Sequence, residues 1–193
     1  MAGVRSDGGF RGENTSGAAN PQSSYSEQGE SSRVDWQTSA LGGLMGNVKL
    51  PLKAELSSEL FLSSGNPYNI TTGTDANGDG NFNDRPSYAS GPGPGVYSTQ
   101  FGMLTINTVN GNVQRNIGTM PSTVHLDTNL SRSFTLARDK DHPRTFTFNA
   151  RSANLLNHTN VTAVNTILSS GAVGRPVAAE TARRIELGVR FTF

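Results

Sequence analysis

The chain has 193 residues, of which 34% are hydrophobic, and it contains no cysteine. The lack of cysteine excludes disulfide frameworks, thiolate metal sites and cysteine nucleophiles, and no apolar run reaches the eighteen residues that a transmembrane helix needs. The formal net charge is +1, with Lys and Arg scattered along the chain. This distribution gives no electrostatic footprint for nucleic acid, so no nucleic-acid partner is expected.

The N-terminal segment, residues 1–36, is polar and rich in Gly, Ser and Asn. It is predicted to be a flexible polar segment, the remnant of an extracellular loop, and it lacks the apolar core of a signal peptide. Nothing in it directs export. The chain is therefore expected either to stay in the cytoplasm or to be a piece of a longer precursor, with Met1 an internal start, a wrongly assigned frame or the start of a truncated gene.

Residues 37–193 favour strands over helices, because Gly, Ser, Thr and Asn are frequent and helix-forming runs are few. Several stretches alternate apolar and polar residues with the period of two that marks a strand. The last stretch is the most regular, since every second residue from Ile185 to Phe193 is apolar. The five predicted strands are 38–49, 52–62, 124–136, 145–155 and 183–193.

The connections between these strands alternate between short and long. The first two strands meet at Pro51, and a polar turn at 137–143 joins the next two, whereas 73–122 and 157–182 are long. Strict alternation is typical of an outer-membrane β-barrel, with short periplasmic turns and long extracellular loops. A soluble β-sandwich is the alternative. Charged and amide residues along the polar faces, strands of about 10 to 13 residues and a terminal aromatic, Phe193, favour the barrel.

Four stretches carry a family resemblance: SGNPYNITTGTDANGDGNFNDRPS at 64–87, DTNLSRSFTL at 127–136, SANLLNHTNV at 152–161 and ARRIELGVRFTF at 182–193. They resemble TonB-dependent receptors, specifically the Oar-like, carboxypeptidase-regulatory-like barrels of Gram-negative bacteria. The resemblance implies an all-β fold, an antiparallel meander of about five long strands that forms the C-terminal part of a 22-stranded barrel with long extracellular loops. Five strands cannot close such a barrel, so the isolated chain is expected to be unstable or to aggregate.

The resemblance also implies a function, which is to contribute barrel strands and extracellular loops for substrate binding and uptake in the outer membrane, without catalysing a reaction. The implied partners are outer-membrane lipid, the barrel-assembly machinery and the remainder of the receptor, namely its plug and other strands. TonB would be reached only through an N-terminal segment that this chain lacks. The alternative is a surface structural or adhesive protein with a calcium-stiffened loop. The barrel-assembly signal would fall on Ile185, Leu187, Val189, Phe191 and Phe193.

The stretch TDANGDGNFNDRP, residues 74–86, predicts a metal site. Its D-x-N-x-D-G spacing matches the first half of an EF-hand loop, in which alternate oxygen ligands converge and a glycine permits the tight turn. Pro86 stands where that loop has a bidentate Glu, so Asp84 would close the site. The prediction is a Ca²⁺ ion that stiffens the loop, the alternative is a solvated polar loop, and no other cofactor is expected. The candidate ligands are Asp75, Asn77, Asp79, Asn81 and Asp84, with Asn83 as a further oxygen.

Other residues predict less. His125, His142 and His158 are far apart in sequence and indicate neither a metal nor a catalytic cluster, and no nucleophile elbow or phosphate-binding loop is present, so no enzyme is expected. Asn110-Gly111 predicts a type I′ hairpin within the long loop. The amphipathic aromatic residues are expected in the interfacial belt of the membrane, with ligand binding as the alternative. They are Trp36, Tyr68, Tyr88 and Tyr97.

Overall fold

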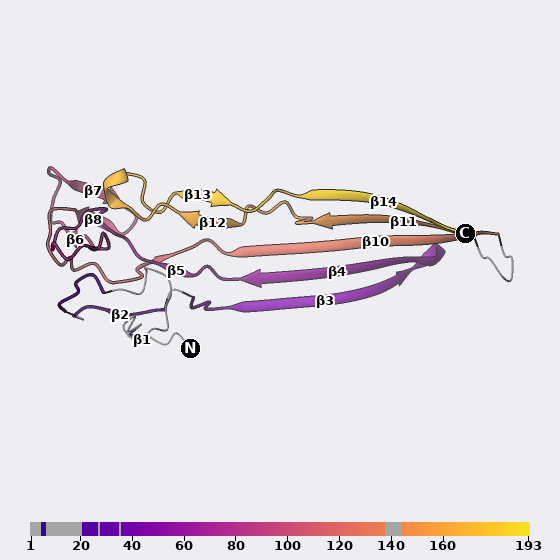
Figure 1. Ribbon diagram of the computed structural model, residues 1–193, viewed down its shortest axis with the longest axis horizontal. Coiled ribbons are helices and arrows are strands. Elements are labelled where there is room, and N and C mark those ends of the chain that lie inside the picture. The colour runs from indigo at the N-terminus through magenta and orange to yellow at the C-terminus, as the bar shows by residue number, and fades with distance from the viewer. Residues whose placement is uncertain (1–4, 7–20, 27, 35, 138–143) are drawn as a thin grey trace. The chain divides into compact units, whose positions relative to one another are not determined.

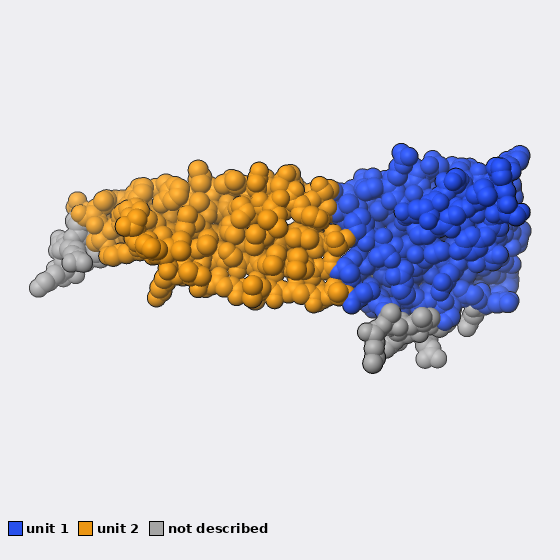
Figure 2. Space-filling view, turned by 180° about the vertical axis from the view of Figure 1, so that it is seen from behind, with its two compact units in different colours: residues 1–39, 64–121, 161–179 blue, residues 40–63, 122–160, 180–193 orange. Residues whose placement is uncertain are grey.

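The computed structural model describes residues 5–6, 21–26, 28–34, 36–137 and 144–193. Among these residues, the regular elements are strands and two short 3-10 turns, η3 (Pro51–Lys53) and η4 (Leu168–Ser170) (Figure 1). Within the described residues, no helix has the length and the apolar character to cross a membrane. The chain divides into two compact units, which Figure 2 colours separately. Unit 1 is 1–39, 64–121 and 161–179, and unit 2 is 40–63, 122–160 and 180–193.

Unit 2 is a five-stranded antiparallel sheet. Each strand pairs with its neighbours in chain order, so the sheet is a meander (Figure 1). This confirms the predicted all-β fold with five long strands, and the observed bounds lie within about three residues of the predicted ones. The strands are β3 (Leu41–Leu50), β4 (Ala54–Ser63), β10 (Thr123–Ala137), β11 (Arg144–Ala153) and β14 (Arg184–Thr192), in the spatial order β14-β11-β10-β4-β3.

A tight turn between β3 and β4 sets their register. Pro51 begins the turn, and Leu52 and Lys53 both take left-handed backbone angles, with φ of 62° and 61°. Leu50 therefore pairs directly with Ala54 at the first position after the turn. The other predicted short turn, 137–143, falls almost wholly outside the described residues, but β10 and β11 pair from Ala137 and Arg144 onward. Long strands joined by short turns leave little freedom for the register to slip.

Unit 1 has its own hydrophobic core, formed by short strands and the segments that join them. Three of its core residues, Ile70, Leu104 and Leu168, have no exposed surface. Ile70 and Leu104 lie between β4 and β10, and Leu168 lies between β11 and β14. The small sheets are β6-β8-β7, β5-β9, β12-β13 and β1-β2. Their strands are β1 (Arg5–Ser6), β2 (Ser31–Ser32), β5 (Pro67–Tyr68), β6 (Ser87–Tyr88), β7 (Val96–Thr99), β8 (Gly102–Thr105), β9 (Gly118–Thr119), β12 (Val161–Val164) and β13 (Pro176–Ala179).

The described part of the polar N-terminal segment belongs to unit 1. Gln22, Ser23, Glu30 and Ser32 are all buried. The Gln22 amide nitrogen Nε2 donates a hydrogen bond of 3.1 Å to the Gly111 carbonyl, which is 89 positions away in sequence. Residues 1–4 and 7–20 of the segment lie outside the described residues. Its described part is therefore held by contacts with the long connection that follows β4.

The prediction of a type I′ hairpin at Asn110-Gly111 is wrong. Asn110 has a left-handed φ of 55°, but the strands that pair in this region are β7 and β8, whose register closes at Thr99 and Gly102. Gly111 is needed for a different reason, because a Cβ there would collide with the carbonyl groups of Arg85 and Pro86. Close backbone packing, and not turn geometry, explains the glycine.

The aromatic residues divide into two groups. Tyr68 is 9% exposed and belongs to the core of unit 1, and Tyr97 packs against that core. The prediction of a membrane-belt or ligand-binding position is therefore wrong for Tyr68. Trp36 and Tyr88 are at least half exposed, and their place in a belt stays a prediction. Burial raises the pKa of the Tyr68 hydroxyl, and a hydrogen bond donated by Gln100 over 3.3 Å offsets this in part.

Candidate functional site

Pairing in register gives the sheet of unit 2 one apolar face. Alternate residues of a strand point to opposite faces, so residues that pair across strands share a face. One row runs through all five strands, and another row on the same face contains Phe134, Phe146 and Phe191. Several of these side chains are exposed, among them Val48, Leu130, Phe134 and Phe191, and Leu187 is 70% exposed. A surface this apolar is stable only where something other than water covers it. The five-strand row is Val48, Leu56, Leu130, Ala150 and Leu187.

The apolar face also holds Arg132, which pairs with Ala54 and Phe148. Its guanidinium carbon lies 4.2 Å from the centre of the Phe134 ring. A cation over an aromatic face gains electrostatic stabilisation, and a long side chain can carry its charge toward water while its stem stays in an apolar layer. Arg132 is therefore compatible with the apolar surface around it.

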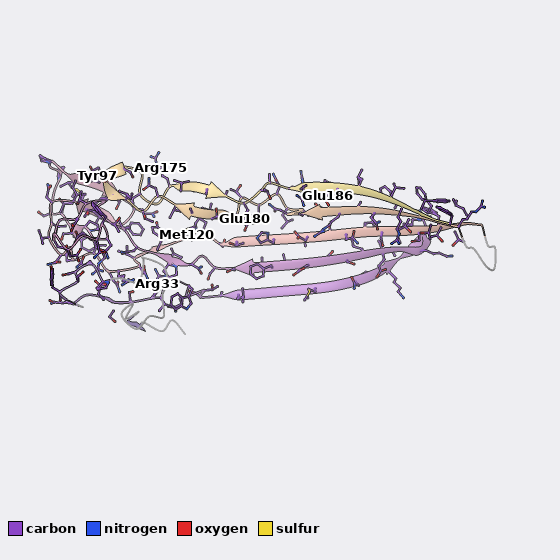
Figure 3. All side chains as sticks on the ribbon, viewed as in Figure 1. Arg33, Tyr97, Met120, Arg175, Glu180 and Glu186 are labelled. Atoms are coloured by element: carbon purple, nitrogen blue, oxygen red, sulfur yellow. The ribbon has the colours of Figure 1, made fainter. Side chains whose placement is uncertain are left out.

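The opposite face of the sheet is polar. Figure 3 shows the side chains along the strands, with Glu186 of β14 labelled. Arg184 Nε and Glu186 Oε1 form an ion pair of 2.9 Å on this face. Phe61, out of phase in the sequence pattern, pairs here with His125, and their ring centres are 6.3 Å apart. One row of this face is Asn47, Ser57, Asn129, Arg151 and Glu186, and the next is Lys49, Glu55, Ser131, Asn149 and Gly188.

The C-terminal strand presents the residues predicted to form an assembly signal. All five are at least 50% exposed, and the first four alternate along β14 on the apolar face. The rings of Phe191 and Phe193 stack, with centres 5.9 Å apart and planes 25° apart. β14 pairs only with β11 among the described residues, so its other edge can accept a strand. Their role in barrel assembly stays a prediction.

The loop 74–86 folds around the carboxylate of Asp75. Its Oδ1 accepts hydrogen bonds from the backbone N–H groups of Gly78 and Asp79, at 2.9 and 3.1 Å, and its Oδ2 accepts one from Gly80 at 3.0 Å. Gly78 and Gly80 have φ of 71° and 86°, which other residues rarely adopt. Asn77 Oδ1 also accepts from the Asp79 N–H, at 3.0 Å. Three of the predicted ligands thus lie together in one tightly wound turn.

Contacts with the N-terminal segment hold the outer side of this loop. Asp79 Oδ2 accepts a 2.7 Å hydrogen bond from the Ser24 N–H, and Asn77 donates one of 2.6 Å to the Gln22 carbonyl. Asn83 donates one of 2.8 Å to Pro21. Backbone N–H groups of Asn81 and Ser24 lower the pKa of the Asp79 carboxyl, because they stabilise its charged form. Charge on Asp79 therefore strengthens the contact between the two segments.

Asp84 differs from the other candidate ligands because it has no exposed surface. Its Oδ2 accepts hydrogen bonds from the N–H groups of Ala76 and Asn77, at 2.7 and 3.4 Å. Its Oδ1 is buried and has no hydrogen-bond partner among the described residues. Across the same residues, no three carboxylates or histidines converge as a metal-binding group. The structure thus gathers the predicted ligands into one loop without bringing their carboxylates to a common point, and calcium binding stays a prediction.

Sequence reasoning missed a buried ion cluster in unit 1. Glu30 accepts from Arg85 Nη1 at 2.6 Å and from Arg115 Nη1 at 3.0 Å, and all three side chains are 2% exposed or less. These residues are 55 and 85 positions apart, so no local pattern in the sequence joins them. A cavity of about 510 Å³ is lined by Arg85, Gln22, Asn112 and other residues.

Two histidines that are distant in the sequence contact the same residue, Asn160, within unit 2. Asn160, which is 1% exposed, lies 2.8 Å from the Nδ1 of His158 and 3.4 Å from the Nδ1 of His125. His125 also forms an ion pair of 3.0 Å with Glu180 when its ring is protonated. Among the described residues, these side chains do not belong to a metal-binding group of three or more, and the absence of a metal or catalytic cluster stays a prediction. His142 lies outside the described residues.

A family model described as an outer membrane beta barrel domain matches residues 7–186. No curated protein and no solved structure matches the chain significantly. The matched region spans sequence from both units.

Proposed function

The chain belongs to the outer membrane β-barrel family and to the outer membrane of Gram-negative bacteria, and from this premise we propose that it forms C-terminal strands and extracellular loops of a TonB-dependent receptor. The receptor would take up a scarce nutrient with energy coupled from the inner membrane. The chain's loops would bind the nutrient and its strands would enclose the barrel lumen, and no reaction is assigned to the chain.

The observation that carries the proposal is the two-faced sheet of unit 2. Five strands in register place Val48, Leu130 and Leu187 on one face and Lys49, Glu55 and Arg151 on the other. Lipid suits the first face, and a water-filled or plugged lumen suits the second. The outer edges of β3 and β14 are unpaired among the described residues, which supports further strands joining the sheet on both sides.

The choice of a receptor over other outer-membrane barrels rests on the long connections. Stretches 64–87 and 152–161 resemble Oar-like receptors, and the first lies in unit 1. That unit has a buried core and a buried ion cluster. A folded loop unit offers a preorganised surface for a ligand, because little conformational entropy remains to be lost on binding. We therefore assign substrate contacts to unit 1.

A deletion strain tests the proposal. The gene is removed, restored on a plasmid, and both strains are grown on limiting amounts of nutrients that are too large for simple porins, with TonB present and with TonB deleted. We expect restoration to recover growth on at least one such nutrient only when TonB is present. Equal uptake by the deleted and restored strains, together with a loss of surface attachment that does not depend on TonB, would favour the structural or adhesive alternative.

A further inference from the structure

The carboxylate of Asp84 is buried without a visible counter-charge. It has no exposed surface and forms no ion pair with Lys, Arg or His among the described residues. Two backbone N–H groups satisfy Oδ2, while Oδ1 has no partner in the described part of the chain. Burying an ionised carboxylate without a paired charge is strongly unfavourable, because the protein interior does not replace the water that stabilises the charge. A positive charge at this place would remove that cost.

The next residue, Arg85, directs its charge elsewhere. Its Nη1 lies 2.6 Å from Glu30 Oε1, its Nε donates to the Val113 carbonyl at 3.0 Å, and its Nη2 donates to the Gly29 carbonyl at 3.3 Å. The guanidinium is thus held by Glu30 and by two carbonyl oxygens. It provides no direct partner for the Asp84 oxygen.

The loop beside Asp84 is rich in oxygen atoms that can accept a further ligand. Asp84 is aimed into this loop, because its Oδ2 binds the N–H groups of Ala76 and Asn77. The Oδ2 of Asp75 and each carboxylate oxygen of Asp79 accept one backbone N–H. A carboxylate oxygen has room for a second interaction. A hard cation such as Ca²⁺ takes six to eight such oxygens, with water in the remaining positions.

We propose that residues 75–84 bind one divalent cation of the size of Ca²⁺, with Asp84 as the buried ligand and Asp75 and Asp79 as the outer carboxylates. Since the three carboxylates do not yet converge, binding draws Asp75 and Asp79 toward Asp84. Asp79 also accepts the N–H of Ser24, so the cation couples the order of the loop to the docking of residues 21–24. Mg²⁺ fits less well, because it keeps most of its water and demands octahedral geometry.

The test is calcium titration of the intact protein, purified in detergent and freed of metal with a chelator. The variant Asp84→Asn keeps an oxygen that accepts the N–H of Ala76 but removes the charge. The matched control is Asp127→Asn, in which the replaced carboxylate also accepts a backbone N–H, from Asn154 at 2.9 Å. We expect one saturable site in the wild type, at least a tenfold weaker affinity for Asp84→Asn, and an affinity within twofold of wild type for the control.

Equal calcium affinities for wild type and Asp84→Asn would overturn the proposal, as would the absence of saturable binding up to about 10 mM, above the range of weak extracellular sites. Hydrogen exchange of the Thr72 amide, which donates to the Asp84 carbonyl at 2.8 Å, shows whether the variant keeps its fold without metal. If Asp84→Asn does not keep its fold, the variant Asp79→Asn tests the proposal instead. The Asp79 carboxylate is only half-buried, and its removal is expected to weaken calcium binding as well. These outcomes do not depend on whether the protein transports a nutrient.

Discussion

Removing the carboxylate of Glu30 is expected to open unit 1 locally while the sheet of unit 2 stays intact. In the variant Glu30→Ala, Arg85 and Arg115 lose the carboxylate that accepts from both, at 2.6 and 3.0 Å, and all three side chains are almost fully buried. The backbone N–H of Gln22, which donates to Glu30 Oε1 at 3.2 Å, loses its acceptor too. The contact between the N-terminal segment and the long connection should weaken first.

The magnitude follows from the burial of this cluster. A hydrogen bond to a charged group contributes about 1.5–3 kcal/mol, and removing one partner of a buried ion pair typically costs about 3–5 kcal/mol. We adopt about 3–5 kcal/mol for Glu30→Ala, because the two guanidinium groups stay buried. Since each 1.4 kcal/mol is a factor of ten, amide exchange in this region should speed up by about 10² to 10⁴. Glu30→Gln keeps an acceptor oxygen, so its rate of amide exchange should lie between those of Glu30→Ala and wild type.

Hydrogen exchange followed by mass spectrometry measures this effect on the intact protein in detergent. The reporters are the amides of Val113 and Thr72, which donate to Pro86 and Asp84 at 3.1 and 2.8 Å and open only when their region opens. The control is Glu55→Ala, an exposed residue of β4, which should change local stability by no more than about 0.5 kcal/mol. An increase of less than tenfold at both reporters would refute the idea that the cluster holds unit 1 together.

Three further changes test other parts of the fold. Leu187→Arg places a charge on the apolar face and should cost about 2–4 kcal/mol near the bilayer midplane, which is measured as a smaller amount of heat-modifiable protein in the outer membrane. Gly188→Arg, the control on the polar face, should be tolerated. Equal losses of folded protein for the two variants would contradict the assignment of faces. Gly111→Ala should make unit 1 more sensitive to protease, because a Cβ there collides with backbone carbonyls, while Gly46→Ala, where the space is open, should not. Burial raises the pKa of the Tyr68 hydroxyl, so the contribution of Tyr68 to stability is complete below about pH 10 and is lost as the pH rises through the folded-state pKa. In a phenolate titration, Tyr68→Phe should remove the tyrosine that ionises last. An unchanged titration would show that Tyr68 is not buried.

The strands of the sheet were predictable because their signal is local. In β14, the alternation from Ile185 to Phe191 is complete, and the structure pairs each of these residues with one on the same face of β11. A shift of register by one residue would exchange the faces, so the pattern specifies the pairing as well as the strand. Phe61 is out of phase with the apolar residues of β4, and the structure pairs it with His125 on the polar face. Period two is a property of the extended backbone, and it needs no partner to be visible.

The candidate cation loop was predictable in part. The spacing of Asp75, Asn77 and Asp79 indicates oxygen atoms on one turn, and the glycines with positive φ wind it as that spacing requires. The sequence alone does not show that Asp84 is buried with an unpartnered oxygen. Burial depends on segments that arrive from elsewhere in the chain, and here residues 21–24 cover the loop.

By itself, the sequence determined the all-β class, the five long strands, their two faces and the alternation of short and long connections. Only the tertiary structure decided that the long connections and the described part of the N-terminal segment fold together around a core. It also decided that Tyr68 belongs to that core and that Glu30 joins Arg85 and Arg115. The physical reason is the distance along the chain. Alternation repeats over two residues, whereas the contacts of Glu30 join residues 55 and 85 positions apart and follow from packing, which leaves no period in the sequence.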